Sequence, residues 1–273
     1  MTSQPPVQRR SWQVMGTVAS LIAGCDPATA DSARDAAAGV LSDIEARMSS
    51  YRPDSEVSRF AAGQLPAGPS ADLRSVLAAC SWLEEVSAGV FSPYPGGPGT
   101  ELDVAGYVKG WAVDRAAEAL DSIGLEHWAL SVGGDWRCRG GHPSGDPWRI
   151  AILDPTDSAQ VRAVVLVADG AVATSGRYER GDHVHLPPGA IGSGTRVGSF
   201  TVTGPQLAFA DAFATVGLLM GVDGLTWVAG FEGYAAALIH ADGTMDADAA
   251  MTLQGGRNWP DPLVADPTRA REY

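Results

Sequence analysis

The chain has 273 residues and a formal net charge of −13, from 19 basic and 32 acidic side chains. This length is enough for one large domain or two closely packed ones. Nucleic acids and anionic membranes require basic patches on a protein, so this net charge argues against either as the main partner.

The N-terminal residues, the length of the apolar stretches and the cysteines indicate a cellular compartment. Arg9 and Arg10 are followed by no apolar run, which argues against a signal peptide or a membrane anchor. No apolar stretch is long enough to span a bilayer. Cys25, Cys80 and Cys138 are odd in number and widely spaced, so we expect reduced, mostly buried thiols rather than a disulfide framework or a zinc site. These features predict a cytoplasmic protein.

The first half of the chain predicts mainly helices. Residues 1–10 are polar and contain prolines, so we expect a flexible N-terminus. The elements expected after it are a strand at 12–23, an amphipathic helix at 27–50, a short segment at 55–60, a second helix at 71–88, a Gly/Pro-rich loop at 89–100, an extended stretch at 102–104 and a helix at 109–123.

The second half predicts mainly strands. They are expected at 128–132, 148–153, 162–168, 171–174, 200–203, 234–239 and 244–246, with a hairpin-like loop at 139–147 and one helix at 206–221. The residues from 257 onward are polar and rich in proline. Helices grouped early and antiparallel-type strands grouped later predict an α+β fold, with one domain over 11–256 and a polar tail at 257–273.

Two oxygen-bearing side chains stand four residues apart in the late helix. Asp211 and Thr215 would therefore lie on one helix face, surrounded by Ala, Phe, Val and Leu. Carboxylate and hydroxyl oxygens suit Mg²⁺ or Ca²⁺, and Mg²⁺ commonly completes its shell with ligand phosphates. The alternative is an N-terminal turn in which Asp211 complements the helix dipole and Thr215 bonds back to a carbonyl.

Four glycine-led turns stand beside polar residues, at 15–17, 105–110, 133–135 and 174–176. Glycine lets backbone N–H groups approach a ligand closely. Lys109, at the expected first turn of a helix, could reach phosphate oxygens while the helix N-terminus adds partial positive charge. Each glycine could equally make only a tight turn. The chain has no GxGxxG and no Walker A motif, so ordinary dinucleotide and P-loop sites are not indicated.

The polar run at 178–185 contains two histidines. His183 and His185 could form half of a metal site, but no third His or Cys follows at a suitable spacing. A single histidine acting as a proton carrier or phosphate ligand, or a solvated loop histidine, remains open.

Taken in order, these motifs resemble the ApbE family of FAD:protein FMN transferases, from about residue 12 to 239. The matching pieces are M-G-T at 15–17, S-x-Y-x-P-D-S-E-V-S-R-F at 49–60, D-x-x-G-x-x-K-G-W-A-V-D at 103–114, G-G-D at 133–135, W-R-I-A-I-L-D-P at 148–155, T-S-G-x-Y-E-R-G-D-H at 174–183 and A-D-A-F-A-T at 210–215. The resemblance implies a single compact, T-fold-related domain with a mostly antiparallel sheet and packed helices.

The resemblance also implies a reaction and a site. FMN would pass from FAD to a Thr or Ser hydroxyl of an acceptor protein carrying a D-x-x-[ST]-G-A-[ST] motif, with Mg²⁺ required and AMP released. By similarity, His183, Asp211 and Lys109 would be catalytic, and Asp211, Thr215 and a backbone carbonyl near Gly106 would hold Mg²⁺. The FAD groove would be lined by Met15, Gly16, Thr17, Tyr51, Asp103, Ala105, Gly106, Lys109, Gly134, Asp135, Thr174, Ser175, Gly176 and His183.

One position departs from the family pattern. Leu186 stands where the family usually has Asp in its H-x-x-D-P-x-T-G segment, and leucine cannot orient His183 or accept a proton. Two further functions are therefore kept beside flavin transfer. One is an FAD pyrophosphatase that yields FMN and AMP, and the other is a non-catalytic FAD-binding homologue.

Overall fold

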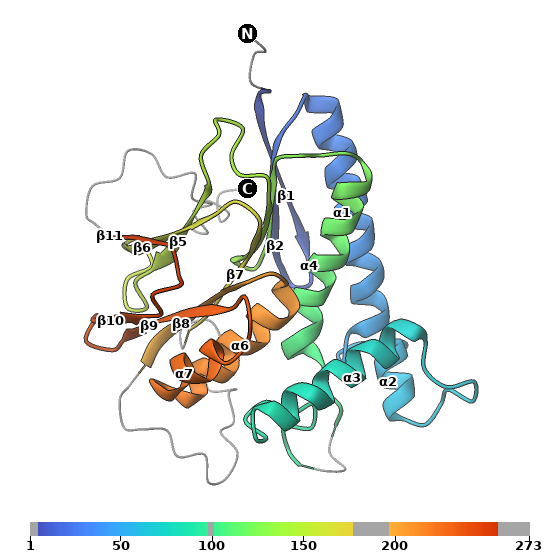
Figure 1. The fold of residues 1–273 in the computed structure, drawn as a ribbon. Helices are drawn as coiled ribbons and strands as arrows, with labels where there is room; N and C mark the ends of the chain where they lie inside the picture. Colours follow the sequence, from blue (N-terminus) through green and yellow to red (C-terminus); the bar gives the residue numbers. More distant parts are fainter. Residues whose placement is uncertain (1–4, 98–100, 177–196, 256–273) are drawn as a thin grey trace.

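An eight-stranded sheet forms the centre of the computed structural model, which describes residues 5–97, 101–176 and 197–255 (Figure 1). Its strands lie in the order β1-β2-β3-β4-β7-β8-β9-β10, and every neighbouring pair is antiparallel. In chain order they are β1 (Val7–Val14), β2 (Thr17–Gly24), β3 (Trp128–Val132), β4 (Asp135–Arg139), β7 (Gly170–Gly176), β8 (Val197–Gly204), β9 (Ala235–His240) and β10 (Met245–Ala247).

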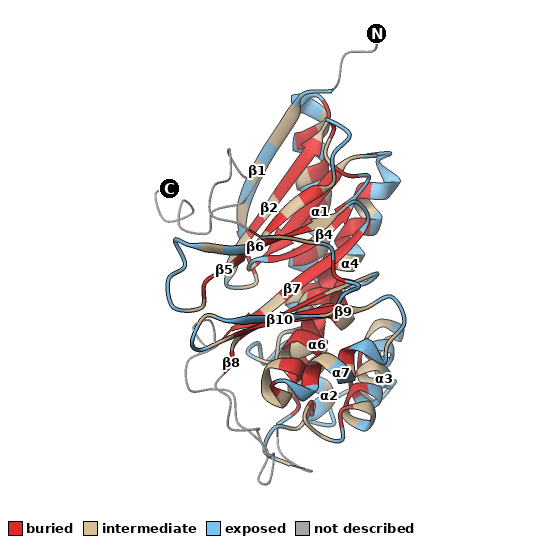
Figure 2. Ribbon diagram, turned by 60° about the vertical axis from the view of Figure 1, so that its left-hand side comes forward, coloured by how far each residue is buried: buried red, intermediate tan, exposed pale blue. Residues whose placement is uncertain are grey.

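A smaller sheet and a set of helices cover the two faces of the large sheet. The small sheet has the order β11-β6-β5 and is also antiparallel, with strands β5 (Trp148–Leu153), β6 (Val161–Val167) and β11 (Leu253–Gly255). Figure 2 shows the buried strands and helix faces between these layers. The helices are α1 (Pro27–Met48), α2 (Glu56–Ala61), α3 (Ala71–Val86), α4 (Ala105–Ser122), α6 (Leu207–Met220) and α7 (Asp223–Ala229).

The alternation of side chains along the central strands divides the core in two. In β7, Ala171 and Ala173 belong to the large core beneath the helices, whereas Val172 belongs to the core beneath the small sheet. Apolar side chains bury on both faces because each face has its own cover. Trp136 and Trp148 fill the second core, and both are almost fully buried.

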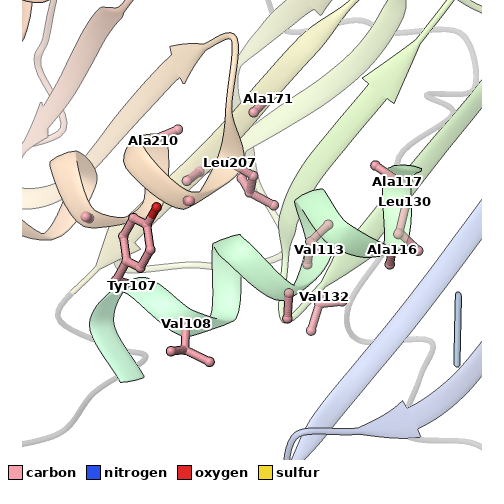
Figure 3. Close-up of a cluster of buried hydrophobic side chains, with 14 of the residues drawn as sticks. Tyr107, Val108, Val113, Ala116, Ala117, Leu130, Val132, Ala171, Leu207 and Ala210 are labelled. Atoms are coloured by element: carbon pink, nitrogen blue, oxygen red, sulfur yellow. The ribbon is translucent and has the colours of Figure 1, made fainter. Parts of the chain in front are cut away.

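Helix α4 lies at the centre of the large core. Figure 3 shows Val113 and Ala116 of α4 near Leu130 of β3, with Leu207 and Ala210 of α6 above the same helix. All of these side chains are buried, so α4 is enclosed by the sheet, α1 and α6. This central helix and its neighbour α6 supply most of the charged residues of the candidate site.

The single strand expected at 12–23 is wrong, because the chain reverses within it. Met15 and Gly16 both have positive φ, 52° and 67°, and they join β1 to β2 as a hairpin. Met-Gly is not among the common turn pairs such as Asn-Gly, so the reversal has little local signal in the sequence. Residues 7–10, expected to be loose, pair with β2 as the first half of β1.

Other boundaries also differ from expectation. Helix α4 begins at Ala105 rather than at 109, because Gly106 lies inside its first turn instead of ending a loop. The stretch 102–104, expected to be extended, precedes this helix without forming a strand. Strands β4 and β11 and helix α7 were not predicted. Strand β4 was missed because its charged residues look like loop, although Asp135 and Arg137 form ion pairs with α4.

The fold class and the cysteine prediction are confirmed. Helices and antiparallel strands segregate as an α+β protein does. All three cysteines are buried and free, and burial raises the pKa of the Cys80 thiol to about 12. Within the three described stretches, no helix combines the length and the apolar character needed to cross a membrane.

Candidate active site

The predicted site residues that the structure describes gather at one end of the large sheet. The β1–β2 turn at Met15–Gly16 lies there because Ala19 of β2 pairs with Val132, the last residue of β3. The β3–β4 turn follows at once, and Asp135 opens β4. The carboxyl end of β7 reaches the same end, since the Thr174 N–H donates to Asp135 Oδ1 at 3.0 Å.

Lys109 stands between two buried carboxylates. Its ammonium forms a hydrogen-bonded ion pair with Asp135 and lies 3.5 Å from Asp211 Oδ2. The side chains of Asp135 and Asp211 are only 4% and 3% exposed, whereas that of Lys109 is 30% exposed. Two carboxylates so far from water need a positive charge beside them. Because Lys109 is partly exposed, its ammonium can contact both the buried carboxylates and a ligand bound from solvent.

Hydroxyl groups surround the charged cluster. Ser175 Oγ and Thr215 Oγ1 are 3.1 Å apart, which links the end of β7 to α6. Thr174 Oγ1 lies 2.9 Å from Thr201 Oγ1 on the neighbouring strand β8. Together with the Asp135 bond to the Thr174 N–H, these contacts fix the T-S-G segment against both β4 and α6.

The alternative interpretation of Asp211 as a helix cap is wrong. Helix α6 begins at Leu207, and its first turn contains no acidic residue. Asp211 stands in the second turn, where its side chain meets Lys109 instead of orphan N–H groups. Lys109 also lies in a second turn, because α4 begins at Ala105, so it was expected one turn too close to the helix N-terminus.

Helix α1 positions the Met15 turn. Glu45 Oε2 accepts the Met15 N–H at 3.0 Å, which ties the last turns of α1 to the β1–β2 hairpin. The Thr17 side chain lies beside Gly133, where an added Cβ would come within 3.4 Å of it. Tyr51 follows α1 at the same end of the sheet and is 89% exposed, so its ring is open to a ligand.

The start of α4 contributes backbone groups. Asp103 Oδ1 accepts the Ala105 N–H at 2.9 Å and so satisfies one of the free donors of the first turn. Gly106 lies close to Phe91, since an added Cβ would come within 3.2 Å of its ring. His183 and His185 lie outside the described residues, as does Leu186.

Two residues that support the cluster were not among the candidates. Glu45 holds the Met15 turn, and Asp114 accepts the N–H groups of Leu207 and Ala208 at 3.0 and 2.9 Å. Both act across at least 30 residues of sequence, so nothing near them in the chain indicates the contact. The only available signal was that Asp114 ends the K-G-W-A-V-D motif that begins at Lys109.

A metal of the expected kind would have few carboxylate ligands. Among the residues that the structure describes, no group of three or more His, Cys, Asp or Glu side chains is arranged to hold a metal ion. Asp211 supplies one carboxylate, and Thr215 supplies a hydroxyl that is already within hydrogen-bond distance of Ser175. Such a mixed set of hard oxygen donors suits Mg²⁺ when ligand phosphates complete the shell.

Comparison with known proteins points to one family. The model of the ApbE family matches residues 15–97 and 94–239. A FAD:protein FMN transferase of Haemophilus influenzae is 27% identical, over 78% of this chain and 80% of that protein. The Vibrio cholerae protein of the same name is 35% identical, over 45% of this chain and 40% of its own length. The Escherichia coli K12 relative is 32% identical, over 54% and 44%. These two matches thus span less than half of the relatives concerned.

Solved structures share the fold over almost the whole chain. A flavin transferase ApbE from Vibrio cholerae aligns with a TM-score of 0.75 and 23% identity, covering 90% of this chain and 98% of that one. An ApbE protein from Thermotoga maritima gives 0.78 and 22%, covering 89% and 97%. At these identities the likeness establishes the fold.

Proposed function

Because the chain belongs to the ApbE family, we propose that it transfers FMN from FAD to a Thr or Ser hydroxyl of an acceptor protein and releases AMP. The observation that carries the proposal is the position of Lys109 between Asp135 and Asp211, beside the hydroxyls of Ser175 and Thr215. An ammonium beside hydroxyl groups is suited to bind the negatively charged oxygens of a pyrophosphate. The names of the relatives from Haemophilus influenzae and Vibrio cholerae support the same reaction.

The reaction breaks the phosphoanhydride bond between the two phosphates of FAD and forms a phosphate ester bond to the acceptor. The acceptor hydroxyl oxygen bonds to the FMN phosphorus, the bond from that phosphorus to the bridging oxygen breaks, and AMP leaves with the bridging oxygen. Negative charge grows on that oxygen, and the Lys109 ammonium would stabilise it. The hydroxyl proton must go to a base, the role that we propose for His183 with help from the solvent.

We propose Mg²⁺ as the metal, held by Asp211, Thr215 and a backbone carbonyl near Gly106. Asp211 is 2% exposed, and its carboxylate already lies beside a cation, the Lys109 ammonium. When bound, Mg²⁺ would supply additional positive charge for the pyrophosphate. Lys109 would then share the carboxylates with the ion and turn toward the phosphates, which its partly exposed side chain permits.

The remaining candidates would hold FAD at the same end of the sheet. Met15, Gly16 and Thr17 lie at the hairpin turn beside Gly133, which Gly134 follows, and the exposed Tyr51 offers a ring for stacking. Asp103, Ala105 and Gly106 would present the start of α4 to the phosphates. The T-S-G segment, Thr174 to Gly176, would line the opposite side of the groove.

We propose that the acceptor is a cytoplasmic protein with a D-x-x-[ST]-G-A-[ST] segment. The chain contains no such segment of its own, so we do not expect it to label itself there.

The experiment incubates the protein with FAD, Mg²⁺ and an acceptor peptide, and it measures AMP, free FMN and labelled peptide. We expect AMP and labelled peptide in equal amounts. AMP with free FMN and unlabelled peptide would instead identify a pyrophosphatase. FAD binding without AMP would identify a non-catalytic flavin-binding protein.

The metal proposal has its own test. Asp211→Asn removes a negative charge, so it should raise the Mg²⁺ concentration needed for half-maximal transfer while the protein remains folded. Calorimetric titration with Mg²⁺ in the presence of FAD measures the same loss without turnover. An unchanged Mg²⁺ requirement in both measurements would contradict the assignment of Asp211.

A further inference from the structure

Helix α6 is capped by a side chain from another helix. Its N-cap residue Gln206 makes no side-chain cap, and the Asp114 carboxylate of α4 accepts the N–H groups of Leu207 and Ala208 instead. A carboxylate at this position also complements the helix dipole. Because Asp114 and the site residue Lys109 lie on the same helix, this cap joins the two helices that carry Lys109 and Asp211.

The same carboxylate also pairs with the sheet. Asp114 Oδ1 lies 3.3 Å from Arg137 Nε, and Arg137 donates a hydrogen bond to the Gly170 carbonyl at 2.8 Å. Asp114 is therefore a junction of α4, α6 and β4. Burial raises the pKa of this carboxyl above its ordinary value, and the hydrogen bonds from the two N–H groups and the charge of Arg137 offset only part of the rise.

The spacing of these pairs fits the site. Asp114 follows Lys109 by five residues, a rise of about 7.5 Å along a helix. Their partners Arg137 and Asp135 are two residues apart on β4, about 6.8 Å along a strand. Two ion pairs of opposite polarity, Lys109 with Asp135 and Asp114 with Arg137, therefore set α4 in one register on β4.

The geometry on α6 follows from the same cap. Lys109 faces Asp211, which lies four residues beyond the capped Leu207, or about 6 Å along the axis. The helices therefore run in opposite directions where they cross. Gly110 lets them touch there, because an added Cβ would lie 2.5 Å from the Leu207 carbonyl oxygen. A slip of one turn would move Asp211 by about 5.4 Å and separate it from Lys109.

We propose that Asp114 is a positioning residue of this site. By capping α6 and pairing with Arg137, it holds Asp211 in register with Lys109 and Asp135. Asp114 touches neither FAD nor the acceptor, and it acts through Asp211. The proposal rests on the flavin transfer proposed above.

The test is a double-mutant cycle on transfer. Asp114→Ala removes the cap and the ion pair, and we expect kcat to fall about 10²-fold, as a small misplacement of a reacting group can cause. Asp114→Asn keeps one oxygen for the N–H groups and should retain more activity. If Asp114 acts through Asp211, adding Asp114→Ala to Asp211→Asn should cause little further loss.

Controls separate positioning from stability. Asp26→Ala removes the side-chain cap of α1, in which the Asp26 carboxylate accepts from the N–H groups of Ala28 and Thr29, and it should leave kcat unchanged. Hydrogen exchange at Leu207, Ala208 and Asp211 should accelerate in Asp114→Ala below its melting temperature. If Asp114→Ala does not fold, Asp114→Asn takes its place in the cycle, with a smaller loss that should again disappear in the Asp211→Asn background.

Two results would overturn the proposal. The first is a double variant whose loss of kcat equals the product of the losses in Asp114→Ala and Asp211→Asn. The second is a wild-type kcat in Asp114→Ala. A wild-type protein that binds FAD without releasing AMP would count against the proposed function alone. In that case the same variants would be compared by their FAD dissociation constants. Adding Asp114→Ala to Asp211→Asn should weaken FAD binding little further. Wild-type FAD affinity in Asp114→Ala, or losses of affinity that multiply fully in the double variant, would overturn the proposal.

Discussion

At the scale of single residues, the site requires that the negative charge of two buried carboxylates is neutralised. Asp135 and Asp211 are each almost completely removed from water, and Lys109 is the cation placed between them. The sequence supplied all three as candidates through motif order. It could not show that they meet, because they come from α4, β4 and α6, and only the packed structure brings these elements together.

Replacing Lys109 tests this balance. Lys109→Met keeps much of the side-chain length but leaves two buried carboxylates without their ammonium, so transfer should fall about 10²–10³-fold, as when one charge-stabilising donor is lost. The melting temperature should fall as well. Lys109→Arg keeps the charge and serves as the control, with an intermediate rate because its planar fork has a different geometry. Steady-state kinetics with FAD would measure both, and a wild-type rate in Lys109→Met would contradict the role.

Asp154 provides a prediction on pH. Hydrogen bonds from the Thr156 hydroxyl and N–H, together with Arg162, lower the pKa of this carboxyl to about 2. Because the folded-state pKa lies below the ordinary 3.8, the ionised group stabilises the fold above that pH, and this contribution is lost as the pH falls toward about 2. Asp154→Asn should therefore be less stable than wild type at pH 6, with a difference that shrinks between pH 4 and pH 2 (roughly the span between the two pKa values). Urea unfolding at several pH values measures this, and a constant difference would contradict it.

At the scale of elements, the crossing of α4 and α6 determines whether the site forms. Apolar periodicity predicted both helices, and it placed Asp211 and Thr215 on one face correctly. It misplaced the start of α4, because a glycine in the first turn resembles the end of a loop. Strand β4 was also not predicted, because its alternating charged residues resemble a solvent-exposed loop. In the structure, they face α4 and form ion pairs with it.

Gly110 tests the crossing directly. In Gly110→Ala the new Cβ would lie 2.5 Å from the Leu207 carbonyl oxygen and 2.7 Å from Ala208 Cα, so backbone must move. We expect a loss of about 1–3 kcal/mol in the free energy of unfolding, as for other overpacked sites. We also expect slower transfer. Gly39→Ala is the matched control, because Gly39 lies within α1 and an added Cβ there meets nothing within 4 Å.

The control should behave in the opposite way. Alanine in a helix interior is favoured over glycine by about 1 kcal/mol, so Gly39→Ala should leave stability unchanged or raise it. Denaturant titration of both variants gives the comparison. Equal stability for the two variants would show that α4 and α6 can separate without cost.

At the scale of the whole molecule, one large sheet carries two cores and a site at one end. Composition and helix-then-strand order predicted the α+β class, and the motif order predicted which residues gather. Neither could predict the pairing of β4 with β7 or of β6 with β11, because these pairings join segments more than 30 residues apart.

The cysteines report on this packing. Cys80 and Cys138 are fully buried, and burial raises the pKa of both thiols, so few thiolates are available. A thiol reagent at pH 8 should leave these two unmodified in the folded protein and should label all three cysteines in denaturant. Mass spectrometry of the labelled peptides gives the count. Rapid labelling of Cys138 in the native protein would contradict the burial between the sheets.

The direction of β1 has a practical consequence for measurement. From Val7 this strand runs eight residues, about 25 Å, to the Met15–Gly16 turn at the active end of the sheet (Figure 1). A biotin or surface tether attached ahead of Val7 would therefore hold the molecule by its opposite end. Immobilised in this way, the protein would present its candidate site to the solution, and a large acceptor protein could reach it without meeting the support.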